Sequence, residues 1–76
     1  MTLAELVAAV LEVSAGEITE DTGRHDTAAW TSLVQIKLVV ALEEAYGVTL
    51  SAADIKALTS VGKARRLLAE KGVTVG

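Results

Sequence analysis

Ser32 is the residue of this chain best placed to carry a covalently attached group. It lies in the run Trp30-Thr31-Ser32-Leu33, where an amphipathic segment begins that ends near Tyr46. Backbone N–H groups at a helix N-terminus are unpaired and carry partial positive charge, so a phosphoester on a hydroxyl there is stabilised. Serine and threonine also cap helices at this position. The local sequence alone favours the cap, and the rest of the chain must decide between a cap and an attachment site.

Other residue combinations that could support chemistry are weak. His25 is next to Asp26, which could suggest a general base and the carboxylate that orients it. No nucleophile is near in this polar segment, so two solvated side chains are the better interpretation. Glu43 and Glu44 are adjacent, so on a helix their side chains point in different directions and do not make a metal site. The chain has no cysteine, so any thiol must be attached later. We therefore expect no catalytic residue, no metal site and no enzyme.

The composition predicts one small globular domain over residues 1–76. Hydrophobic residues make up 51% of the chain, which argues against disorder, and aromatic residues only 3%. Four basic residues, Lys63, Arg65, Arg66 and Lys71, crowd the C-terminal segment without an aromatic residue among them, so we expect no nucleic-acid partner. No stretch is long and apolar enough to span a membrane, and the N-terminus does not resemble a signal peptide. The cytoplasm is the predicted compartment.

Hydrophobic periodicity predicts four helices, one of them short, at about residues 3–13, 32–46, 52–58 and 61–71. A long ordered loop over residues 14–31 separates the first two, and residues 73–76 are expected to fray. Helix boundaries are marked by capping signals at Thr2, Gly47 and Ser51. The helix at 32–46 is expected to turn one broad apolar stripe to the core: Leu33, Ile36, Val39 or Val40, and Leu42 or Ala45.

Four motifs in sequence order resemble those of acyl and peptidyl carrier proteins, over nearly the whole chain. They are Glu17-Ile18-Thr19, Thr31-Ser32-Leu33, the run Leu42-Glu43-Glu44-Ala45-Tyr46-Gly47-Val48, and Leu58-Thr59-Ser60-Val61-Gly62. The resemblance implies an all-α four-helix bundle whose signature serine, here Ser32, bears 4′-phosphopantetheine from coenzyme A. Leu33 would contact the base of that arm. The implied partners are a phosphopantetheinyl transferase, an acyl- or aminoacyl-loading enzyme and a downstream synthase or transferase.

The chain also departs from the family pattern around Ser32. Thr31 stands where the family usually has aspartate, and Val34, Gln35 and Lys37 stand where fatty-acid carriers are acidic and exposed. Because charge complementarity sets partner choice, we expect a more apolar contact with a reversed charge at Lys37. Thr31, Val34 and Lys37 are thus candidate partner-recognition residues. Trp30 is a further candidate, although a plug that anchors the long loop is the favoured interpretation of this residue.

Two functional hypotheses from different classes follow. The first is a freestanding carrier, expected because the chain starts with Met1 and ends soon after its last helix, and monomeric as the family resemblance implies. The non-acidic start of the segment 32–46 adds the expectation of a specialised polyketide, nonribosomal peptide or related pathway. The second is an unmodified helical adaptor. This hypothesis stays open because Thr31 stands where the family usually has aspartate. Ser32 separates them, because a carrier needs this hydroxyl and an adaptor does not.

Overall fold

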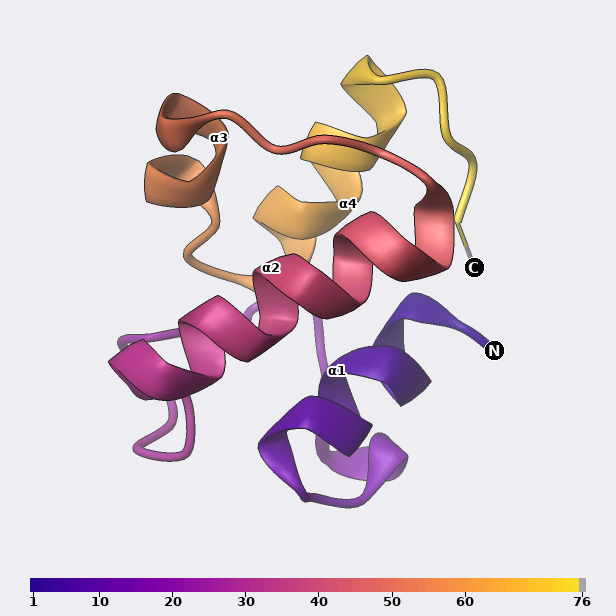
Figure 1. Ribbon diagram of the computed structural model, residues 1–76. Helices are drawn as coiled ribbons and strands as arrows, with labels where there is room; N and C mark the ends of the chain where they lie inside the picture. Colours follow the sequence, from indigo (N-terminus) through magenta and orange to yellow (C-terminus); the bar gives the residue numbers. More distant parts are fainter. Residues whose placement is uncertain (76) are drawn as a thin grey trace.

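The computed structural model describes residues 1–75, which contain helices and no β-strand. Figure 1 shows α2 crossing the molecule, with α1 on one side of it and α3 and α4 on the other. The predicted all-α four-helix bundle is confirmed. Its elements are α1 (Leu3–Leu11), the 3-10 turn η1 (Ala15–Glu17), α2 (Ser32–Tyr46), α3 (Ala52–Ala57) and α4 (Val61–Glu70).

Side-chain caps set the starts of these helices. At α1 the Glu5 amide donates to Thr2 Oγ1 (3.1 Å) and the Thr2 amide donates to the Glu5 carboxylate (2.7 Å). The Glu5 carboxylate is charged in this arrangement, and the Thr2 amide lowers its pKa. The same reciprocal pair forms at Ser51, as the sequence predicted. Gly47 ends α2 with a positive φ of 64°, also as predicted.

Three helices end earlier than the sequence predicted, and the C-terminal residues also differ from the prediction. Glu12 adopts a left-handed conformation with φ of 60°, and the Val13 amide returns to the Ala8 carbonyl (3.0 Å), so α1 stops at Leu11 instead of residue 13. Helices α3 and α4 each end one residue earlier than predicted. The expected fraying of residues 73–76 is wrong for residues 73–75, because Val73 and Val75 pack against the core. Residue 76 lies outside the described residues.

The face that α2 buries is only partly the predicted one. Leu38 and Leu42 reach the core, whereas Leu33 and Ile36 are 61% and 63% exposed and Val40 is 47% exposed. The core is otherwise built from leucine, valine and alanine side chains of α1 and α4, with Trp30, Leu50 and Leu58 from the connections. The predicted stripe is confirmed at Leu42 and Val39, which are in or against the core, and is wrong at Leu33 and Ile36. It fails there because α2 carries apolar side chains on opposite faces, so periodicity alone does not fix its rotation.

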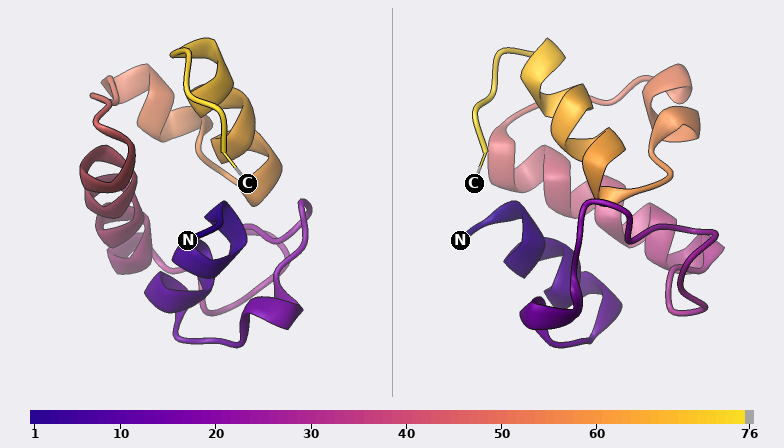
Figure 2. Two further views of the ribbon diagram at one scale, coloured as in Figure 1. Left: turned by 90° about the vertical axis from the view of Figure 1, so that its right-hand side faces the viewer. Right: turned by 180° about the vertical axis from the view of Figure 1, so that it is seen from behind.

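The long loop is held on the first turn of α4. The Arg24 amide donates to the Thr59 carbonyl (3.1 Å), and the amides of Val61 and Gly62 donate to carbonyls of the loop (both 2.9 Å). The Arg65 guanidinium pairs with the Glu20 carboxylate (2.8 Å), and this hydrogen bond lowers the pKa of Glu20. The right-hand view of Figure 2 shows the loop passing beside the start of α4. No helix among residues 1–75 is long and apolar enough to cross a membrane.

At Gly23 the loop packs closely against Thr59 and Ser60, the residues just before α4. A Cβ atom on this glycine would collide with the carbonyl oxygen of Thr59, whereas nothing lies within 4 Å of a Cβ at Gly16 in the same loop. We expect Gly23→Ala to lower the free energy of unfolding by about 1–3 kcal/mol, because a backbone atom must move. Gly16→Ala is the matched control and should change it by less than about 0.5 kcal/mol. Urea denaturation of both variants checks this, and equal stabilities would contradict the close packing.

Candidate functional site

The start of α2 separates the two interpretations of Ser32. The Val34 amide donates to Thr31 Oγ1 (3.2 Å), and the extended backbone of Thr31 makes it the N-cap. Ser32 is the first residue of the helix, its side chain is exposed, and within residues 1–75 its hydroxyl makes no hydrogen bond. Capping is therefore done by Thr31, and the hydroxyl of Ser32 is left available.

The surroundings of this hydroxyl suit a phosphate. In the described part of the chain the amides of Ser32 and Leu33 have no hydrogen-bond acceptor, as expected for the first turn of a helix. The first turn of α2 contains no acidic side chain that would repel an anion. A phosphodiester on Ser32 Oγ would thus lie at the positive end of a 15-residue helix, close to free N–H donors.

Trp30 is buried in the core, two residues before Ser32. It is only 4% exposed, and its indole Nε1–H donates to Oε1 of Gln35 (2.7 Å). This burial agrees with the favoured interpretation of Trp30 as a plug that anchors the loop, and its candidate role in partner recognition stays a prediction. The expectation that Gln35 is exposed is wrong, since this side chain is 8% exposed and its amide is bonded inside the bundle.

A mainly apolar surface follows Ser32 along α2. We call Leu33, Ile36, Lys37 and Val40 the outer face of α2; all four are exposed, and their spacing of three and four residues places them on one side of the helix. Val34, the predicted apolar contact, is half-buried and packs against the core. The exposed apolar residues beside Ser32 are thus Leu33 and Ile36, which the sequence prediction had assigned to the core.

The two acidic residues near the end of α2, Glu43 and Glu44, lie in different surroundings. The half-buried carboxylate of Glu43 accepts a hydrogen bond from the Leu50 amide (2.9 Å), so it holds the connection to α3 in place. Glu44 is exposed. No group of three potential metal-ligating side chains occurs within residues 1–75.

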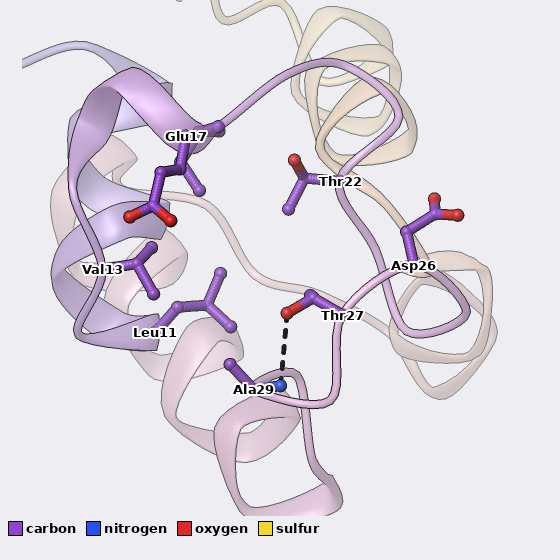
Figure 3. A pocket seen from close by; sticks show the side chains of 8 residues that line it. Leu11, Val13, Glu17, Thr22, Asp26, Thr27 and Ala29 are labelled. Atoms are coloured by element: carbon purple, nitrogen blue, oxygen red, sulfur yellow. Dashed lines mark hydrogen bonds between the residues drawn. The ribbon is translucent and has the colours of Figure 1, made fainter.

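A cavity of about 170 Å³ lies between the end of α1 and the long loop, away from the outer face of α2. Figure 3 shows the side chains of Leu11 and Val13 on one side of it and Asp26 and Thr27 on the other, with the Ala29 amide donating to Thr27 Oγ1 (3.3 Å). Ser32 does not line this cavity, which is bounded by Leu11, Val13, Glu17, Ile18, Thr22, Asp26, Thr27 and Ala29.

The division of roles between Thr31 and Ser32 can be measured as stability. We expect Thr31→Ala to lower the free energy of unfolding by about 1 kcal/mol, because it removes the N-cap of α2. Ser32→Ala should change it by less than about 0.5 kcal/mol, because this hydroxyl bonds to nothing in the fold. Chemical denaturation of both variants provides the comparison. A larger loss in Ser32→Ala than in Thr31→Ala would show that the assignment of the cap is wrong.

The position of Ser32 at the start of α2 agrees with the known proteins to which this chain is similar. A family model described as the phosphopantetheine attachment site matches residues 2–68. Polyketide-8 synthase acyl carrier protein 2 of Streptomyces avermitilis is 36% identical over 69 residues, which cover 91% of this chain and 79% of that relative. The cofactor of the family is covalently bound 4′-phosphopantetheine. The chain therefore belongs to the family of phosphopantetheine-binding carrier proteins, as its motifs predicted.

Proposed function

We propose that Ser32 bears the 4′-phosphopantetheine arm and that the protein holds acyl or aminoacyl intermediates on it as thioesters. The observation that carries this proposal is the free hydroxyl of Ser32 on the first residue of α2, beside a cap supplied by Thr31. The chain contains no cysteine, so the thiol that thioester chemistry requires must come from the arm.

Attachment of the arm is a phosphoryl transfer in which Ser32 supplies only the oxygen. Ser32 Oγ forms a bond to the β-phosphorus of coenzyme A, the bond from that phosphorus to the bridging oxygen breaks, and adenosine 3′,5′-bisphosphate leaves. No base of this chain is bonded to Ser32 in the described residues, so the transferase must accept the proton. Leu33 lies next to the attachment point and is largely exposed, which suits contact with the base of the arm.

The pathway is proposed from the relative and from the surface of α2. The similar Streptomyces protein is named as a polyketide synthase acyl carrier protein. We assign the present chain to a specialised pathway of polyketide, nonribosomal peptide or related type, as a freestanding monomer that does not itself catalyse. Its partners are then a phosphopantetheinyl transferase, a loading enzyme and a downstream synthase or transferase. The cytoplasm stays the predicted compartment.

An intact-mass measurement tests the attachment. The wild-type protein is incubated with coenzyme A and a promiscuous phosphopantetheinyl transferase, with Ser32→Ala alongside. We expect one phosphopantetheinyl group on the wild type and none on the variant. Loading of Ser32→Ala would move the site to another residue, and absence of the group from wild-type protein, both in this assay and after recovery from the native host, would contradict a carrier.

The outer face of α2 is the proposed contact with partner enzymes. Leu33, Ile36 and Val40 offer apolar area, and Lys37 offers a positive charge among them. A partner that fits this face has an apolar surface with a carboxylate placed opposite Lys37, because charge complementarity selects partners and speeds encounter. The contact is intermittent, since a carrier must visit several enzymes.

Substitutions on this face should weaken binding of the loading enzyme without affecting the fold. We expect Ile36→Asp and Lys37→Glu each to raise the KM of the loading reaction about tenfold, equivalent to about 1.4 kcal/mol of binding. Ala9→Asp is the matched control, because it adds the same charge at an exposed position of α1. Steady-state kinetics with a dedicated loading enzyme measure the effect. Unchanged KM values for both α2 variants would show that this face is not the contact.

The alternative is an unmodified adaptor that uses the same face. The exposure of Leu33 and Ile36 favours a protein contact in either case. The adaptor keeps its function in Ser32→Ala and loses it in Ile36→Asp, whereas the carrier loses its function completely in Ser32→Ala.

A further inference from the structure

The amide of Gln35 is a buried polar group that joins three segments of the bundle. Its Oε1 accepts the hydrogen bond from Trp30 Nε1 (2.7 Å), and its Nε2 donates to the carbonyls of Ile55 and Leu58 (both 2.9 Å). Every buried side-chain nitrogen and oxygen of the described residues has a partner, so this network is complete. A complete buried network is rigid, because each bond that opens leaves a polar group unpaired.

One half of the network fixes the turn that carries Ser32. Thr31 is the N-cap of α2, so Trp30 is the residue before the cap and Gln35 is the fourth residue of the helix. Side chains at these two positions commonly pack together and fix the angle at which the chain enters the helix. Here the contact is a hydrogen bond as well as packing. Trp30 and Gln35 therefore bracket Ser32 on both sides and hold its turn in one conformation.

The other half of the network holds α3. This helix has six residues, none of them buried, so it is too short to be stable alone. Its start is capped by Ser51, and Lys71 pairs with Asp54 (2.9 Å). The Ser51 amide and, to a lesser extent, Lys71 lower the pKa of Asp54. At its end, Gln35 donates from α2 to two carbonyls. The Ile55 carbonyl also accepts from the Leu58 amide (3.2 Å), whereas the Leu58 carbonyl, at the C-cap, has Gln35 as its partner in the described residues.

We propose that Gln35 is a positioning residue, which couples the conformation of the Ser32 turn to the docking of α3. This inference rests on the proposed attachment of the arm to Ser32. The transferase must meet the hydroxyl in a defined geometry, and misplacement of a reacting atom by about 1 Å can slow a reaction about a hundredfold. Gln35 acts before any enzyme binds, by holding that hydroxyl between two anchored residues, and through the same amide it keeps α3 against α2.

Two substitutions separate the halves of the network. Gln35→Met is similar in shape and removes all three hydrogen bonds, whereas Trp30→Phe keeps an aromatic plug and removes only the bond to Oε1. The control is Val73→Ala, a half-buried position packed on the core outside the network, which lowers stability without touching Gln35. Ile36→Asp provides the contrast, because it changes the contact face and leaves the network intact.

The first readout is the kinetics of phosphopantetheinylation. We expect Gln35→Met and Trp30→Phe to lower kcat about tenfold with KM within about twofold, whereas Ile36→Asp should raise KM and leave kcat nearly unchanged. When assayed at a temperature below its own melting temperature, the Val73→Ala variant should have the wild-type kcat. If Gln35→Met is folded and keeps the wild-type kcat, or if Val73→Ala lowers kcat equally, Gln35 does not position Ser32.

The second readout does not depend on the arm. Hydrogen exchange of residues 52–58 should accelerate at least about tenfold in Gln35→Met and stay close to wild type in Trp30→Phe, because only the first variant removes the donors to α3. Equal exchange in wild type and Gln35→Met would overturn the coupling to α3. A wild-type protein that is never loaded would refute the proposed attachment instead, and the exchange data would still report on the network.

Discussion

Helix α2 carries more apolar side chains than this bundle buries, and the surface around Ser32 follows from that excess. Leu38 and Leu42 complete the core, and the opposite side of the helix remains in water with Leu33 and Ile36 largely exposed. A helix that is apolar all round is usually covered on every side. Here the uncovered side begins directly after Ser32, so the position of the hydroxyl and the position of the exposed apolar area are set by the same helix.

The polar network around Gln35 explains which side of α2 faces inward. Rotation of α2 to bury Ile36 would carry Gln35 out of the bundle and leave the indole N–H of Trp30 and the Leu58 carbonyl without partners, because only the Ile55 carbonyl has a second bond, from the Leu58 amide. Each unpaired buried group is unfavourable by about 1–3 kcal/mol, so the alternative rotation is disfavoured by two such terms. The network thus selects between two apolar faces that hydrophobicity alone leaves nearly equal.

The sequence predicted the parts of this fold that depend on local chemistry. The capping pairs at Thr2 and Ser51 and the glycine at position 47 act over a few residues, so spacing alone was enough to place those helix boundaries. The rotation of α2 is a tertiary property and was predicted only in part. Gln35 was assigned to the surface because it stands where fatty-acid carriers have exposed acidic residues, and that resemblance does not report which way this helix is turned. The available signal was a tryptophan before the cap and a residue able to bond it four positions into the helix.

The site itself was predictable in kind because it needs little from the chain. Ser32 has no activating base in the described residues. In the proposed carrier, this protein would supply an accessible oxygen, a fixed turn and a contact surface, and a partner would supply the reaction. These features lie within the first turns of α2. A neutral cap at Thr31 leaves that first turn without an acid, and Lys37 is the nearest charge of the outer face. On the proposed attachment, the phosphodiester would be the main negative charge there. A partner that relies on attraction between a basic surface and an acidic helix finds little to attract it before the arm is attached. If the outer face of α2 is the contact, as proposed, selectivity would come from apolar fit and from a carboxylate facing Lys37, which would favour dedicated partners over those that serve acidic carriers.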